Sequence, residues 1–176
     1  MLYEYSKIGT LCDESNGLTC SFDTAKKWGQ AKQILPYSTF EEAAEDVKYG
    51  NIYAFLVPGA YPKVGSFIMD AKLVVKDVFI KTIPSLVLVG TDKIPPSNTV
   101  VLFHHPATTP LLSEVEIPFK EEQPVTSNSK ACTALLDSAS EALAITNELC
   151  ASFYKLNVYK ILRAGLLMPF ICFVRA

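Results

Sequence analysis

The stretch from residue 142 to residue 173, ALAITNELCASFYKLNVYKILRAGLLMPFICF, constrains the fold of this chain more than any other. It opens with a short apolar run, after which Thr146 and Asn147 offer side chains that begin helices. Glu148 follows in the first turn, where an acidic side chain suits the helix dipole. An extended pattern returns at residues 158–162, and a last apolar segment closes the stretch. The pattern predicts strand, helix, strand, loop and strand, as in α/β folds.

The residue pattern in the first half of the chain predicts alternating strands and helices. This order favours a parallel sheet with right-handed crossovers. The firmest helix follows a capping box formed by Ser38 and Glu41, and Gly50 ends it. Two later strands, 73–80 and 86–89, have no obvious helix between them, so we expect the chain to cross there into a second lobe. The other expected elements of the first half are strand 4–9, helix 18–28, strand 33–35 and strand 51–57.

Polar residues or abrupt turns follow several of the predicted strands. In open α/β sheets ligands bind at the carboxyl ends of strands. If these turns converge between two lobes, their hydroxyls and helix N-termini suit a carboxylate or a phosphate. Each turn taken alone is better explained as a simple cap or turn. The turns lie at residues 9–15, 57–61, 104–106, 127–129 and 146–147.

Composition limits the classes of protein to which the chain can belong. Hydrophobic residues make up 49% and charged residues 19%, which is enough for a packed core and argues against disorder. The net charge of −2 gives no electrostatic reason to expect nucleic acid or an anionic membrane as a partner. No uncharged apolar run reaches the ~18 residues of a membrane span. The N-terminus lacks the pattern of a signal peptide.

The cysteines and histidines argue against disulfides and metal. There are five cysteines, an odd number with irregular spacing, which predicts reduced thiols in a cytoplasmic protein. No C-x-x-C pair is present, and the only histidines are the adjacent His104 and His105. This pattern predicts neither a metal site nor a cofactor.

Several passages resemble the catalytic domain of prephenate dehydratases, a two-lobed fold of the type 2 periplasmic-binding-protein kind. The similarity is greater to a divergent branch, the prephenate decarboxylases of bacilysin-type antibiotic pathways. It implies one α/β domain with a cleft between a first lobe of about residues 1–70 and 157–176 and a second of about 71–156. The passages are VPGAY at 57–61 with Phe67 and Met69, His105-Pro106, SNSKA at 127–131, and AITNEL at 144–149 with Tyr154 and Leu156.

Departures from the dehydratase motifs indicate which reaction to expect. The Thr-Arg-Phe motif of the dehydratases keeps only Phe173 here, since Ile171 and Cys172 replace the other two residues. In their Pro-x-Glu-Asn-Ser motif, Ala60 replaces the glutamate and Tyr61 the asparagine. These changes argue against dehydration. They resemble the decarboxylases, in which carbon dioxide leaves prephenate without aromatisation.

Other departures bear on the substrate. Gly59 stands where the decarboxylase branch has histidine, and Cys12-Asp13 align with a Gly-Thr pair of the N-terminal loop, whereas Ser15 keeps that loop's serine. An acidic residue at position 13 would repel a dicarboxylate. The substrate can therefore differ from prephenate.

The candidate site residues each have a structural alternative. Tyr61 can donate to a carboxylate or deliver a proton, or it is a packing tyrosine. His105 can act as the general acid that protonates the ring, or it belongs to a structural turn. Arg163 and Lys63 can pair with substrate carboxylates, or they are surface charges. The further candidates for substrate binding are Thr10, Ser15, Gly59, Ala60, Ser127, Asn128, Ser129, Thr146 and Asn147.

Two hypotheses of different kinds follow. The first is a cofactor-free lyase of secondary-metabolite biosynthesis that decarboxylates prephenate or a related cyclohexadienyl carboxylic acid. The alternative is a non-catalytic or divergent member of the fold that binds a small carboxylate or aromatic ligand. An isomerase or dehydratase acting on another small acid is a third possibility. Apolar strands and helices in the final third of the chain leave room for a homodimer.

Overall fold

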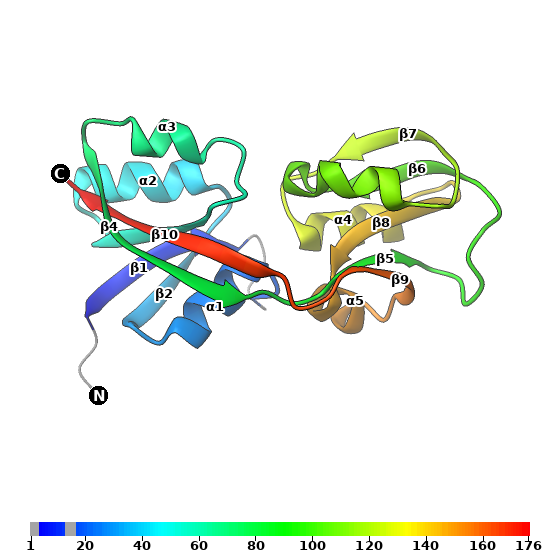
Figure 1. Ribbon diagram of the computed structural model, residues 1–176, viewed down its shortest axis with the longest axis horizontal. Coiled ribbons are helices and arrows are strands. Elements are labelled where there is room, and N and C mark those ends of the chain that lie inside the picture. The colour runs from blue at the N-terminus through cyan, green and yellow to red at the C-terminus, as the bar shows by residue number, and fades with distance from the viewer. Residues whose placement is uncertain (1–3, 13–16) are drawn as a thin grey trace. The chain divides into compact units, whose positions relative to one another are not determined.

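The computed structural model describes residues 4–12 and 17–176, which form two compact units (Figure 1). The first unit contains Met1–Ile83 and Leu167–Ala176, and the second contains Pro84–Leu166. The chain therefore passes between units at residues 83/84 and 166/167, later than the positions 70/71 and 156/157 expected from the sequence. The reason is strand pairing, since residues 73–82 join the first sheet and residues 157–163 join the second.

The first unit is built on a five-stranded sheet of order β2-β1-β3-β10-β4. The strands β1, β2 and β3 are parallel, as the alternating pattern predicted, and β10 is antiparallel to both of its neighbours. The bounds are β1 Tyr5–Leu11, α1 Cys20–Trp28, β2 Ala31–Tyr37, α2 Phe40–Tyr49, β3 Ala54–Pro58, α3 Val64–Ile68, β4 Leu73–Thr82 and β10 Leu167–Arg175.

Aromatic side chains fill the core of this unit beneath α2 and α3. Phe55 of β3 stacks on Phe173 of β10 with ring centroids 5.1 Å apart, and Phe67 of α3 meets both rings edge-on. Such pairs add stability beyond the burial of their surface. Phe173, the one residue retained from the dehydratase motif, is thus a core residue of the first unit.

The helix α2 begins one residue later than the capping box predicted. The side chain of Thr39, rather than Ser38, accepts the hydrogen bond from the backbone N–H of Glu42 at 3.1 Å. Glu41 therefore does not form the expected reciprocal cap, and its carboxylate contacts Tyr61 and Lys63 instead. The predicted end is confirmed, because Gly50 closes the helix with a φ of 78°.

The second unit carries a sheet of order β7-β6-β8-β5-β9. The strands β6, β7 and β8 are parallel, and β5 runs antiparallel between β8 and β9. Residues 119–124 form the edge strand β7, which is exposed over most of its length. The bounds are β5 Leu86–Gly90, β6 Thr99–His104, the 3-10 helix η1 Pro106–Glu114, β7 Phe119–Pro124, α4 Asn128–Asp137, β8 Ala142–Asn147, α5 Glu148–Phe153 and β9 Asn157–Arg163.

The two sheets share one plan. Each has four strands in one direction and a single antiparallel strand, β10 or β5, in the fourth position. Each antiparallel strand is the one that the chain forms on entering the unit from the other unit. The carboxyl ends of the parallel strands consequently meet at one edge of each sheet.

Candidate ligand site

Three helix-capping side chains lie at the carboxyl-end edge of the second sheet. His105 follows β6, Ser127 follows β7 and Asn147 ends β8. Their side chains accept backbone hydrogen bonds from Ala107 (3.1 Å), Lys130 (3.0 Å) and Cys150 (2.9 Å), respectively. The sequence-predicted turns of this unit therefore do come together at one sheet edge, each as the start of a helix.

Buried hydroxyls and thiols join the starts of α4 and α5. Thr146 donates its hydroxyl to the carbonyl of Asn128 at 2.9 Å, and the thiol of Cys132 donates to the Thr146 hydroxyl at 3.2 Å. The Ser129 hydroxyl lies 3.7 Å from the sulfur of Cys150. Ser127, Ser129, Thr146 and Asn147 are all buried. These groups thus fix the two helix starts against β8, and the N-terminus of the ten-residue α4 supplies a positive dipole end at this edge.

The hydrogen bond to the His105 ring defines the tautomer of its neutral form. Its Nδ1 accepts the hydrogen bond from Ala107, so the neutral ring carries its proton on Nε2. Its backbone carbonyl accepts a hydrogen bond from the Thr108 hydroxyl at 2.8 Å. His105 therefore acts as a helix cap through Nδ1, which is the structural alternative that the sequence left open.

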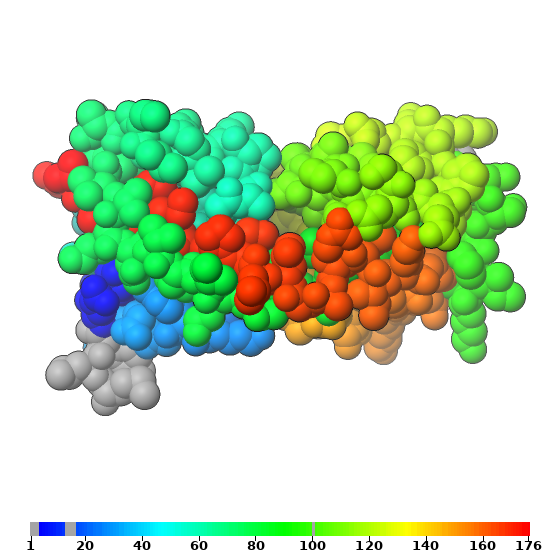
Figure 2. Space-filling model, viewed as in Figure 1, coloured from blue at the N-terminus to red at the C-terminus, as the bar shows by residue number. Residues whose placement is uncertain are grey.

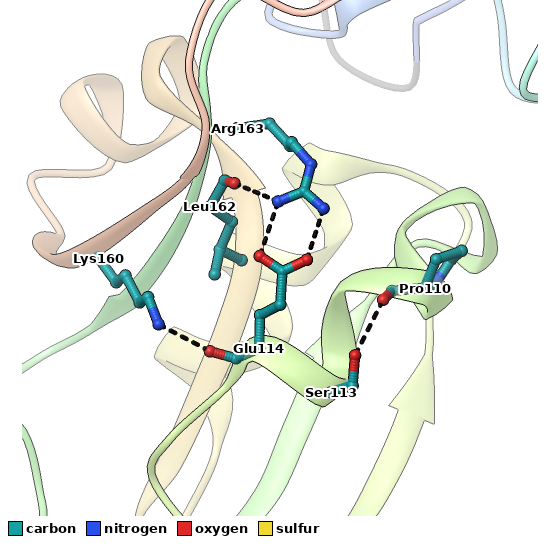
Figure 3. A network of polar contacts seen from close by, with 6 residues as sticks. All are labelled: Pro110, Ser113, Glu114, Lys160, Leu162 and Arg163. Atoms are coloured by element: carbon teal, nitrogen blue, oxygen red, sulfur yellow. Dashed lines mark hydrogen bonds and ion pairs between the residues drawn. The ribbon is translucent and has the colours of Figure 1, made fainter.

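Arg163, expected as a substrate partner, pairs with Glu114 instead (Figure 3). One guanidinium nitrogen, Nη1, lies 2.7 Å from Oε2 of Glu114, and Nη2 contacts the other carboxylate oxygen. Lys160 donates to the Glu114 carbonyl at 3.0 Å. The hydrogen bonds from Arg163 lower the pKa of Glu114, and the pKa of Arg163 is raised by the same contact. A substrate carboxylate would have to share or displace Glu114 to use this cation.

In the first unit, Tyr61 belongs to a small polar network. Its hydroxyl donates to Oε1 of Glu41 at 2.8 Å, and Nζ of Lys63 lies 3.2 Å from the same oxygen. Its ring packs against Phe40 and Phe67. Burial, followed by the hydrogen bond to Glu41, raises the pKa of Tyr61 above that of an ordinary phenol. Tyr61 is consequently a weak proton donor. Its ring packs in the core, and its hydroxyl positions the Glu41 carboxylate.

The ionisation of Glu41 follows from the same contacts. Burial raises the pKa of its carboxyl group, but the hydrogen bonds from Tyr61 and Lys63 outweigh burial and leave the pKa below its usual value. Glu41 is therefore a carboxylate held against a phenol. The sequence pointed to Glu41 only as a capping residue, because nothing local links it to a tyrosine 20 positions away.

The remaining candidates of the first unit have structural contacts. Thr10 is buried and donates its hydroxyl to the Leu56 carbonyl at 2.8 Å, which ties β1 to β3. Gly59 donates its backbone N–H to the Pro169 carbonyl at 2.8 Å, and a Cβ at Gly59 would lie 2.9 Å from Cγ of Pro169. Ala60 is exposed. Ser15 and Asp13 lie outside the described residues.

A hollow of about 480 Å³ in the first unit lies away from these candidates. Lys7, Asn51, Tyr53 and Arg175 contribute to its lining, so it opens at the opposite edge of the sheet, where β1 begins and β10 ends. It therefore contributes nothing to the predicted site.

Within residues 4–12 and 17–176, no group of three or more His, Cys, Asp or Glu side chains is placed to hold a metal ion. No helix in the same ranges is both long and apolar enough to cross a membrane.

Comparisons with known proteins identify the fold. No family model and no curated protein matches the sequence. Among solved structures, the prephenate dehydratase of Arthrobacter aurescens, solved in complex with L-Phe, matches 97% of this chain with a TM-score of 0.67 and 19% identity. The prephenate dehydratase of Staphylococcus aureus matches 96% with a TM-score of 0.62 and 12% identity. The methionine-binding protein MetQ matches 97% with a TM-score of 0.60 and 16% identity.

The matched lengths differ between these proteins. The chain spans 60% of the Arthrobacter dehydratase, 66% of the Staphylococcus dehydratase and 82% of MetQ. Dehydratases and a binding protein therefore share its architecture, at identities that carry information on fold alone. The chain has the two-lobed, periplasmic-binding-protein-like α/β fold that prephenate dehydratases also adopt.

Proposed function

We propose that this chain binds a small carboxylic acid and decarboxylates it without aromatisation, with prephenate or a related cyclohexadienyl acid as substrate. The observation that carries the proposal is the gathering of His105, Ser127 and Asn147 at one edge of the second sheet. A role in secondary-metabolite biosynthesis would follow from the resemblance to the decarboxylase branch.

Binding of a carboxylate is supported by the start of α4. Its N-terminal dipole favours an anion, and the buried contacts of Ser129 and Thr146 hold the backbone of this turn in place. Preorganised donors of this kind bind charge without reorganising when the ligand arrives. The ligand class that fits is a small acid, in agreement with neighbours solved with L-Phe or described as binding methionine.

The proposed reaction needs one proton and no dehydrating group. The bond between the ring and its carboxylate breaks, carbon dioxide leaves, and the electron pair moves through the ring diene. A ring carbon then takes up a proton while the ring hydroxyl stays in place. We assign the proton to Nε2 of His105 in the imidazolium form, which is a stronger acid than the phenol of Tyr61. Forming the imidazolium places a proton on Nδ1 as well, so the hydrogen bond from Ala107 is released in that state.

Incubation with prephenate tests this proposal. The expected product has lost one carbon dioxide, keeps its hydroxyl group and lacks the absorbance of an aromatic ring. Mass spectrometry and ultraviolet absorbance together identify it. Recovery of unchanged prephenate, or of phenylpyruvate alone, would contradict the assignment.

A second candidate function is ligand binding without catalysis. Two side-chain pairs favour it, Arg163 with Glu114 and Tyr61 with Glu41. In each pair, a residue predicted to contact the substrate is already bonded to a glutamate of the chain itself. Titration calorimetry with prephenate, phenylalanine and phenylpyruvate distinguishes the two functions. Binding with no change in the mass of the recovered ligand supports this second function.

A further inference from the structure

The strand β4 differs from the other strands that end the two sheets. Within the described residues, β4 pairs with β10 on one side and with no strand on the other. The edge strand β2 contains Pro36 and the edge strand β7 ends in Pro124, and proline discourages pairing with another strand. In β9, the side chains of Lys160 and Arg163 are tied to residues 114–116. The edge of β4 has ten residues and no proline.

Apolar side chains are exposed along β4. Val78 and Ile80 are 57% and 64% exposed, and Val74 and Val75 are also well exposed. Figure 2 shows atoms of β4 and of the adjacent β10 together on one face of the first unit. A long edge strand with this character is a template for pairing with another chain.

The sequence of β4 is complementary to itself in the antiparallel direction. Residues 73–80 are LVVKDVFI, in which three apolar residues precede Lys76 and three follow Asp77. A two-fold axis between Lys76 and Asp77 places each lysine opposite the partner's Asp77. It also places Val75 opposite the partner's Val78. An isologous interface requires this kind of self-complementarity.

A β-bulge makes the two-fold pairing geometrically consistent. In a regular strand, Val75 and Val78 would point to opposite faces, because side chains alternate. Here the register against β10 shifts, so that Val75 lies opposite Phe173 and Asp77 opposite Cys172, which leaves Lys76 as the extra residue. Val75 and Val78 consequently point to the same face. The bulge residue, Lys76, lies at the centre of the self-complementary segment.

We propose that two copies of this chain associate through antiparallel pairing of β4, about a two-fold axis between Lys76 and Asp77. The Asp77 carboxylate accepts a hydrogen bond from the backbone N–H of Val78 at 2.8 Å, so in the proposed pairing it exchanges this bond for the partner's Lys76 and releases the N–H. Beyond residues 73–80, Lys81 would come opposite the partner's Lys72, and this repulsion limits the register. Pairing uses the free edge of both strands, so the assembly closes at two chains.

Two charge variants test the interface, measured by sedimentation equilibrium from low to high micromolar concentration. The wild type is expected to form a dimer of about 39 kDa, twice the 19.4 kDa of one chain. Lys76→Asp gives two adjacent acidic residues and Asp77→Lys two adjacent basic ones, so each variant alone repels its copy. We expect each to raise the dimer dissociation constant at least about tenfold.

Mixing the two variants distinguishes the proposed pairing from general damage. The acidic variant complements the basic one in the same register, so an equimolar mixture should recover a heterodimer near the wild-type affinity. Lys32→Asp on β2, an exposed lysine at the other edge of the sheet, should leave the dimer unchanged. A monomeric wild type, dimeric single variants or a mixture that stays monomeric would each overturn the proposal.

Discussion

The Tyr61 hydroxyl donates a 2.8 Å hydrogen bond to Glu41, which joins the turn after β3 to the first turn of α2. Tyr61→Phe keeps the ring packing against Phe40 and Phe67 and removes only this bond. We expect a loss of about 1 kcal/mol in the free energy of unfolding, because the carboxylate loses a donor while solvent still reaches it. Urea denaturation measures the loss. Decarboxylation should change less than about threefold, since the proton is assigned to His105.

Glu41 makes this stabilisation depend on pH. Its pKa is lower in the folded chain than in the unfolded chain, so its contribution is complete above the unfolded value of about 4.5. The contribution is lost as the pH falls through the lower, folded value. Wild type and Glu41→Gln should therefore differ most at neutral pH and converge in acid. A difference that grows toward low pH would contradict the proposed role of Glu41.

His105 combines a helix cap with the proposed proton donor, and two substitutions separate these roles. His105→Asn keeps a side-chain acceptor for the N–H of Ala107 but removes Nε2. We expect it to fold normally and to lose about 10²-fold or more in the rate of decarboxylation. His105→Ala should lose the same activity and also about 1 kcal/mol of stability. A His105→Asn variant with the wild-type rate would exclude this histidine as the donor.

The pair of Glu114 and Arg163 is open to test through the substitution Glu114→Gln. Removing the carboxylate charge should change the free energy of unfolding little, because both side chains are partly exposed. The cost should shrink as salt is added. If Arg163 also contacts the ligand, Glu114→Gln should tighten binding of a carboxylate in calorimetry. Glu121→Gln, an exposed acidic residue of β7, is the matched control.

Gly59 and Gly65 form a matched pair of glycines in the first unit. A Cβ at Gly59 would lie 2.9 Å from Cγ of Pro169, whereas at Gly65 no atom lies within 4 Å. Gly59→Ala should therefore destabilise the protein by about 1–3 kcal/mol. Gly65→Ala in α3 should instead stabilise it, by up to about 1 kcal/mol. Melting temperatures compare the two directly. By the same argument, Gly59→His, the histidine of the decarboxylase branch, requires Pro169 to move.

Sequence patterns predicted the parts of this fold that depend on local chemistry. The helix Phe40–Tyr49, its glycine end and the alternating strands of the first unit follow from periodicity and capping. The similarity to prephenate dehydratases predicted the two-lobed architecture, which the solved structures bear out. The choice of Thr39 over Ser38 as cap was missed, because adjacent hydroxyl residues give the same local signal.

Contacts between residues far apart in the chain could not be predicted from local sequence patterns. The pair of Glu114 with Arg163 joins residues 49 positions apart, and no local pattern selects one acidic residue over its neighbours for that contact. The same holds for strand β4, whose pairing with β10 decides the boundary of the first unit. The candidate residues were located at strand ends by general rules, but their partners depended on the tertiary fold.

The position of β10 between β3 and β4 has a consequence for how the protein is made. The second unit is one continuous segment, Pro84–Leu166, and has all its strands as soon as that segment leaves the ribosome. The first unit lacks an interior strand until residues 167–175 are synthesised. Its nascent form must therefore wait with β3 and β4 unjoined while the second unit folds. The sheet that contains the earliest residues of the chain is thus completed only by its last strand.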